Sequence, residues 1–133
     1  MIDAVSFSLP STAVWIIVGL LSAFFVFSST IKIFAWQRTV FDAQMEFMRL
    51  YGISRQMFFG IGVIELLGAS IIWFQQSLIG LIGICLLGGT SIVAFGFHVR
   101  FDSWKNGIPA MVTAGLSGVL FLQNLSVIEK VIN

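Results

Sequence analysis

Long apolar runs alternate with short polar segments along the chain. Four of the runs are long enough to cross the hydrocarbon core of a bilayer, which takes about 20 predominantly apolar residues. They cover residues of about 14–36, 57–74, 78–97 and 108–125. Helices of this length span roughly 27–33 Å at about 1.5 Å per residue. The pattern predicts four membrane-spanning helices in a single transmembrane domain over residues 1–133.

A shorter amphipathic segment lies between the first and second runs, over residues of about 40–51. Its apolar and charged side chains fall on opposite faces of a helix, which is typical of a helix lying in the membrane interface. Thr39 and Asp42 have the spacing of a capping box, Gly52 is a typical C-terminal stop, and Ser54 suits the start of the next helix. The predicted fold class is therefore an all-α, integral membrane four-helix transmembrane bundle with a short interfacial helix between spans one and two. We favour a packed connector over a partner-binding helix for this segment.

Composition narrows the class of protein further. Hydrophobic residues make up 58% of the chain and charged residues 10%, whereas about a quarter of a soluble domain is charged. A soluble domain of this size could not bury so much apolar surface. The formal net charge of +1 gives no electrostatic footprint for nucleic acid, and a single cysteine excludes a disulfide framework.

The basic residues indicate an orientation. Six of the seven lie in or beside the segments that follow the first and third runs: Lys32, Arg38, Arg49, Arg55, Arg100 and Lys105. Because cytoplasmic loops carry an excess of lysine and arginine, we expect these segments on the cytoplasmic side and both termini outside. We expect the bilayer to be a bacterial inner membrane.

Glu65 is the most informative single residue, because it lies well inside the second apolar run. Ionisable residues within membrane spans are costly and usually functional, and they face the bundle interior. We expect Glu65, Lys32, His98 and Arg100 to converge on one intramembrane polar site. The alternatives are a purely structural ion pair for Glu65, snorkelling of Lys32 to the interface, a capping histidine and a topology-setting arginine.

Small residues predict where helices approach one another closely. The candidates are Gly62, Gly68, Ala69, Ala110, Ala114 and Gly118. One histidine and one cysteine about a dozen residues apart do not form a metal site. We therefore expect no metal site, no catalytic residues assignable from the sequence and no intrinsic cofactor.

Several short motifs in order resemble the DoxX/DoxX-like family of small four-helix membrane proteins. These are Ser28-Ser29-Thr30-Ile31-Lys32, Tyr51-Gly52, Gly62-x-x-Glu65-x-x-Gly68, Ala94-x-x-x-His98-x-Arg100 and Ile108-Pro109-Ala110. The Gly-rich, acidic C-terminal ending of some members is absent here. The resemblance implies a role beside redox or assembly systems, because the family is named after a membrane subunit of a thiosulfate:quinone oxidoreductase. It also implies that Lys32, Glu65 and His98 form the polar core of the bundle, where a quinone or another lipid could bind.

We therefore expect an accessory or assembly subunit of a larger membrane complex, with quinone-linked redox chemistry as one form of that role. Its expected partners are the lipid bilayer and other membrane subunits or further copies of the chain. One alternative is a small proton-coupled transporter, although a lysine near the glutamate opposes the titration that exchange needs. Another is a membrane enzyme acting on a quinone- or isoprenoid-like lipid, with Glu65 and His98 as acid and base. We favour no enzymatic activity for the chain on its own.

Overall fold

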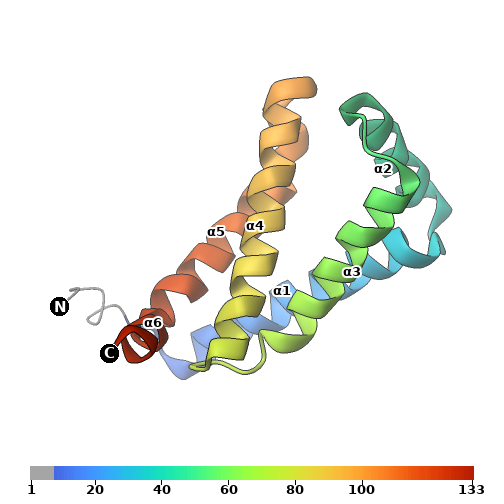
Figure 1. Cartoon of the computed structure of the whole chain (residues 1–133). Coiled ribbons are helices and arrows are strands. Elements are labelled where there is room, and N and C mark those ends of the chain that lie inside the picture. Colours follow the sequence, from blue (N-terminus) through green and yellow to red (C-terminus); the bar gives the residue numbers. More distant parts are fainter. Residues whose placement is uncertain (1–7) are drawn as a thin grey trace.

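The computed structural model describes residues 8–133, and the regular elements in this part of the chain are helices (Figure 1). The order is α1 (Ser11–Phe34), α2 (Arg38–Tyr51), α3 (Arg55–Ile71), α4 (Leu78–Phe101), the 3-10 helix η2 (Trp104–Gly107), α5 (Ile108–Gln123) and α6 (Leu125–Ile132). The packing runs from α1 to α3, from α3 to α4 and from α4 to α5. The all-α prediction is confirmed.

The helices differ in length. α1 and α4, with 24 residues each, are long and apolar enough to cross a membrane on their own. α3 has 17 residues and α5 has 16, which correspond to about 26 and 24 Å. Each reaches the length of a span only when it is joined to a neighbouring helix. α3 joins α2 at a bend of 116°, and η2–α5 joins α6 at a bend of 48°. The structure therefore gives two to four crossings, and the division into four spans stays a prediction.

The ends of the helices have local causes. α1 ends at Phe34, earlier than expected, because Ala35 adopts a left-handed conformation with φ of 54°. The capping box at Thr39 is wrong, since the side chain of Gln37 caps α2 by accepting a hydrogen bond from the Val40 N–H. The other two signals are confirmed, because Gly52 ends α2 with φ of 77° and Ser54 caps α3.

Glycines set the closest helix contacts. A Cβ on Gly62 would lie 2.9 Å from the Lys32 Cβ, and a Cβ on Gly68 would lie 2.8 Å from the Leu87 side chain. Ala69 is fully buried. On α5, Ala110 and Ala114 are half-buried, but Gly118 is exposed and has no atom within 4 Å of its Cβ position. The predicted small-residue face of α5 is thus not its packing face, which consists of Thr113, Ser117 and Leu120.

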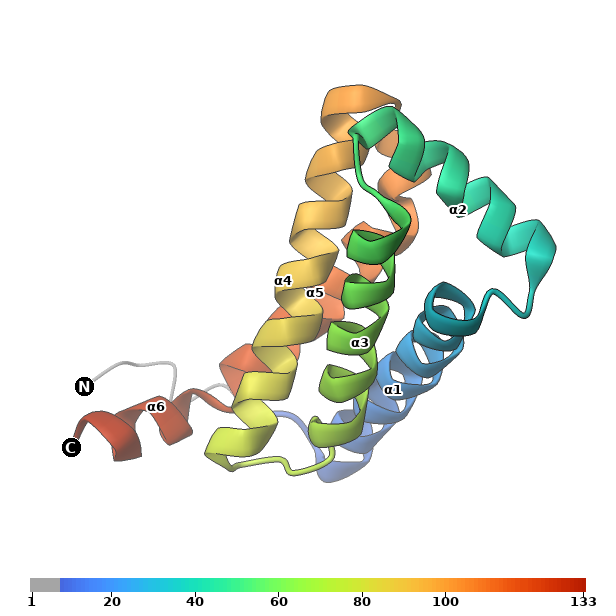
Figure 2. The same ribbon diagram turned by 45° about the vertical axis from the view of Figure 1, so that its right-hand side comes forward.

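α3 and α4 diverge along their length (Figure 1). They are close near the turn that joins them, where Gly68 meets Leu87 and Gly83 meets Ile71. At their far ends α2 runs across the gap, from the end of α1 to the end of α4 (Figure 2). The amphipathic helix predicted between the first two spans therefore covers the open end of the bundle.

The opposite end of the bundle is held by Asn124, which is fully buried at the break between α5 and α6. Its Oδ1 accepts from the Gln76 N–H at 2.7 Å, and its Nδ2 donates to Gln75 Oε1 and Leu120 O. These bonds tie the α3–α4 turn to the end of α5. The tail is a separate helix, α6, set at an angle of 48° to α5.

Candidate functional site

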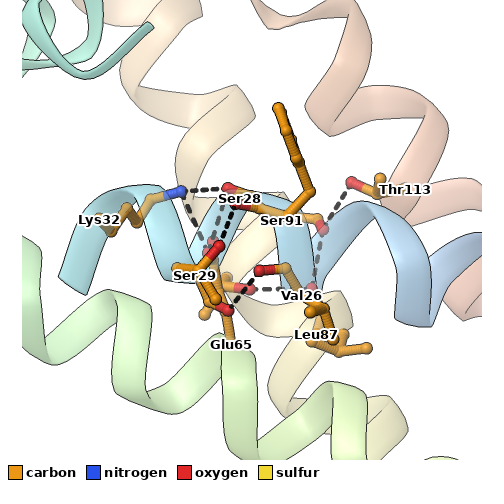
Figure 3. Close-up of polar contacts among 11 residues, drawn as sticks. Val26, Ser28, Ser29, Lys32, Glu65, Leu87, Ser91 and Thr113 are labelled. Carbon is orange, nitrogen blue, oxygen red and sulfur yellow. Dashed lines mark hydrogen bonds and ion pairs between the residues drawn. The ribbon is translucent and has the colours of Figure 1, made fainter. Parts of the chain in front are cut away.

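A buried ion pair joins α1 to α3. Lys32 Nζ lies 3.0 Å from Glu65 Oε1, and the two residues are 8% and 6% exposed. Ser28, one turn before Lys32, accepts a hydrogen bond from the ammonium and donates to Glu65 Oε1 at 3.3 Å (Figure 3). The Lys32 ammonium also lies 5.5 Å from the centre of the Phe58 ring. Each charge therefore has a partner inside the bundle.

The sequence around this pair explains why the two side chains meet. Gly62 is one turn before Glu65 on α3 and has no side chain, so Lys32 and Ser29 of α1 can pack directly against the α3 backbone. Close approach of the two helices places the lysine stem beside the carboxylate on the next turn. The motif Gly62-x-x-Glu65 is thus a single packing unit with Lys32.

A second polar cluster joins α2 to the end of α4. His98 Nδ1 lies 2.9 Å from Asp102 Oδ1 and 2.9 Å from the Tyr51 hydroxyl, which donates to Asp102 Oδ2. Because Tyr51 gives its only proton to Asp102, its oxygen accepts from His98. His98 therefore carries a proton on Nδ1, and both the Tyr51 hydroxyl and the Asp102 carboxylate accept a hydrogen bond from it.

The electrostatics of this cluster support that assignment. Burial alone would raise the pKa of Asp102, but hydrogen bonds from Tyr51, His98, Asn106 and the Ser103 backbone lower it well below its usual range. Burial, and then the hydrogen bond and the charge of Asp102, raises the pKa of Tyr51 above its usual range. Asp102 is thus a carboxylate at neutral pH, and Tyr51 is a neutral phenol.

The diverging helices leave a cavity between the two clusters. It has a volume of about 320 Å³, lies between α2, α3 and α4, and has mostly apolar walls. Its polar side chains are Lys32, Gln44, Tyr51, Glu65, Thr90 and His98. A second cavity of about 240 Å³ between α1, α4 and α5 shares five of these six, and Tyr51 is the exception. The ion pair and His98 therefore face both cavities.

Three of the four residues expected to converge line this space, and Arg100 does not. Arg100 is exposed, and its guanidinium lies 5.4 Å from the centre of the Phe101 ring. Because Arg100 is two residues beyond His98 on the same helix, its side chain lies about 200° further around the helix axis and points away from the cavity.

Sequence reasoning missed Asp102, Gln44 and the role of Tyr51 in the site. Asp102 is four residues after His98, which is the spacing of facing side chains on a helix. That signal could have identified the pair. Gln44 gave no signal, because a glutamine on an amphipathic helix is ordinary.

Two further observations bear on the chemistry of the site. Ser91 of α4 and Thr113 of α5 share a hydrogen bond of 2.7 Å beside the second cavity (Figure 3). Within residues 8–133 the structure contains no group of three His, Cys, Asp or Glu side chains that could hold a metal ion. The arrangement can hold a polar head group with an apolar body, and its carboxylate and imidazole can accept hydrogen bonds or protons.

The model of the DoxX-like family matches residues 16–120. This stretch includes every side chain that lines the two cavities. A search of curated proteins and a search of solved structures find no match.

Proposed function

The chain belongs to the DoxX-like family of helical membrane proteins, and from this premise we propose that it is an accessory or assembly subunit of a larger membrane complex, in which it binds the head group of a quinone- or isoprenoid-type lipid. The observation that carries the proposal is the cavity of about 320 Å³ with the Lys32–Glu65 pair on its wall. Ligand sites are commonly apolar clefts of this size or larger with a few fixed polar groups.

The location of the polar groups supports a lipid-soluble ligand. An ion pair inside a bilayer is costly, so it is usually kept where it serves a ligand or an ion path. Here the pair lines a space whose other walls include the rings of Phe47, Phe58 and Phe97. A molecule with an apolar body and a polar head matches both features.

The small number of residues that could ligate a redox centre supports the accessory role. The chain has one histidine and one cysteine, whereas an iron–sulfur cluster commonly takes four such ligands. Electrons for any redox chemistry of the bound lipid would therefore come from a partner subunit. The transporter alternative is weaker, because the Lys32 ammonium lies 3.0 Å from the carboxylate that would have to exchange protons.

The proposal is tested by identifying the molecules that stay bound to the protein after gentle extraction from the membrane. Protein purified into lipid nanodiscs is analysed by mass spectrometry for copurified quinones, isoprenoid lipids and partner subunits. In Gly89→Leu, leucine would extend from the edge of the cavity into open space, since no atom lies within 4 Å of the Cβ position. The matched control is Gly96→Leu, which also has open space and lies two turns further along α4, outside both cavities.

We expect the wild type and Gly96→Leu to retain one lipid species that Gly89→Leu loses, with all three equally stable. A wild-type protein that carries neither a bound lipid nor a partner subunit would overturn the proposal.

Membrane type and orientation belong to the same proposal. The α2 and η2 end carries most of the basic residues, so we place it in the cytoplasm of a bacterial cell and α6 on the outer side of the inner membrane. Leu9, just before α1, bonds Gln123 at the α6 end, so α1 starts on the same side. Alkaline phosphatase fused after Asn133 should be active, and an inactive fusion would reverse the orientation.

A further inference from the structure

The polar side chains of the larger cavity differ in whether they already have partners. Among its donors, Lys32 bonds Ser28 and Glu65, Thr90 donates to Leu87 O at 3.0 Å, and Tyr51 donates to Asp102. The Thr90 and Tyr51 hydrogens, and two of the three hydrogens of the Lys32 ammonium, are therefore directed to the protein itself.

Three acceptors in the same cavity have no hydrogen-bond partner among residues 8–133. Gln44 Oε1 is buried and unbonded. Glu65 uses Oε1 for both of its bonds and leaves Oε2 free. His98 holds a proton on Nδ1, which faces Asp102 and Tyr51, so Nε2 is an acceptor when the ring carries one proton. Within the part of the chain described, two cavity donors are left against these three acceptors. One is the amide nitrogen of Gln44, on the same side chain as one of the acceptors, and the other is the third hydrogen of the Lys32 ammonium, which lies beside the Phe58 ring.

The excess of unpaired acceptors over unpaired donors indicates which kind of ligand the cavity prefers. A buried acceptor without a donor costs free energy, and the penalty is recovered when a ligand supplies the hydrogen. We infer that the cavity selects a membrane-dissolved molecule whose head group donates hydrogen bonds, which is a hydroquinone or another hydroxyl-bearing ring in preference to the corresponding quinone. A quinone offers only acceptors, and these would face the acceptors of Glu65, His98 and Gln44. This inference rests on the proposed lipid-binding function and specifies the chemical form that is bound.

The edge of the cavity shows how such a molecule would enter. Two of its lining residues on α4, Gly89 and Val93, are exposed, and Val93 is 58% exposed on the outside of the bundle. α3 and α4 diverge away from the turn that joins them (Figure 1). A ligand can therefore keep an apolar chain in the bilayer while its head lies beside Glu65.

Gln44 is the specificity residue that the inference assigns. It is the polar residue that α2 contributes to both cavities. Its orphaned oxygen has no structural role in holding α2, so its replacement should leave the fold intact. Gln56, an exposed glutamine of α3 outside the cavities, provides a control for the same chemical change.

The experiment compares three probes with one skeleton: 2-decyl-1,4-hydroquinone, the corresponding quinone and the hydroquinone dimethyl ether. Binding to the wild-type protein in nanodiscs is measured by titration calorimetry at pH 8 under anaerobic conditions. The ether partitions into lipid without donating hydrogen bonds. We expect the hydroquinone to bind at least about tenfold tighter than the quinone or the ether, as expected for two or more hydrogen bonds.

The variants then locate the preference. Gln44→Leu should weaken hydroquinone binding about fivefold and leave ether binding unchanged, because about one hydrogen bond is lost. Gln56→Leu should change neither. Equal binding of hydroquinone and quinone would overturn this inference and leave the lipid-binding function standing. Binding of none of the three probes to a correctly folded protein would overturn both.

Discussion

Replacing one partner of the Lys32–Glu65 pair should destabilise the bundle far more than replacing both. At 3.0 Å and an effective dielectric constant of about 20, the attraction between the charges is about 5 kcal/mol. Glu65→Leu leaves the Lys32 ammonium buried with only Ser28 and the Phe58 ring as partners. Breaking a buried pair in this way costs about 3–5 kcal/mol, and these remaining partners place the expected loss near the lower end.

The double variant Lys32→Met with Glu65→Leu removes both charges and keeps the volume of both side chains. Buried pairs replaced by apolar residues are often close to neutral, so we expect the double variant to recover most of the stability lost in either single variant. The interaction energy from the cycle should be at least about 2 kcal/mol. The stability of Glu65→Gln should lie between those of the wild type and Glu65→Leu, because the glutamine amide oxygen can still accept a hydrogen bond from Lys32.

Unfolding in mixed micelles of increasing sodium dodecyl sulfate content measures these differences. Tryptophan fluorescence is a suitable probe, since Trp15 stacks on Trp73 and the indole of Trp73 donates to Ser22 in the folded bundle. Glu46→Gln breaks the exposed pair with Arg49 and should cost under about 0.5 kcal/mol. If the double variant loses as much stability as the two single variants together, the pairing argument fails.

Three further predictions address other contacts. Gly62→Ala should lower stability by about 1–3 kcal/mol through overpacking, whereas Gly60→Ala, with open space around its Cβ position, should be neutral or stabilising in the same unfolding assay. Because the pKa of Asp102 is lowered in the folded protein, its bonds should stabilise the α2 contact fully above about pH 4 and lose this effect as the pH falls below it. Hydrogen exchange of α2 amides should show this acid dependence in the wild type and not in Asp102→Asn. Asn124→Leu should cost at least about 2 kcal/mol in thermal unfolding, because buried donors and acceptors lose their partners; an unchanged midpoint would contradict this account.

Much of the fold could be predicted from local pattern. Apolar runs give the bundle helices, and Gly52 and Ser54 mark the ends of helices because their effects depend on the adjacent backbone. The small neighbours of Glu65 place it toward the bundle interior, because only a close helix contact uses glycine in that way. The exact ends of α1 and α2 could not be predicted, since Ala35 and Gln37 take uncommon roles there.

The second half of the site depends on contacts between distant parts of the chain. Tyr51 and Asp102 are 51 residues apart, and they meet because α2 turns back across the bundle at 116° to α3. No local pattern encodes that angle. The cavity is likewise a product of where α3 and α4 part, which depends on glycine contacts such as Gly68 with Leu87.

The position of that glycine contact has a mechanical consequence. α3 is about 26 Å long. It contacts α4 near one of its ends, and the ligand cavity extends toward the other end. A tilt of α3 about this contact moves Glu65, one turn away, very little, but it moves Phe58 on the cavity wall, about 15 Å along the helix, several times further. A bulkier residue at position 68 would therefore change which membrane molecule the cavity accepts, without any change in the residues that contact that molecule.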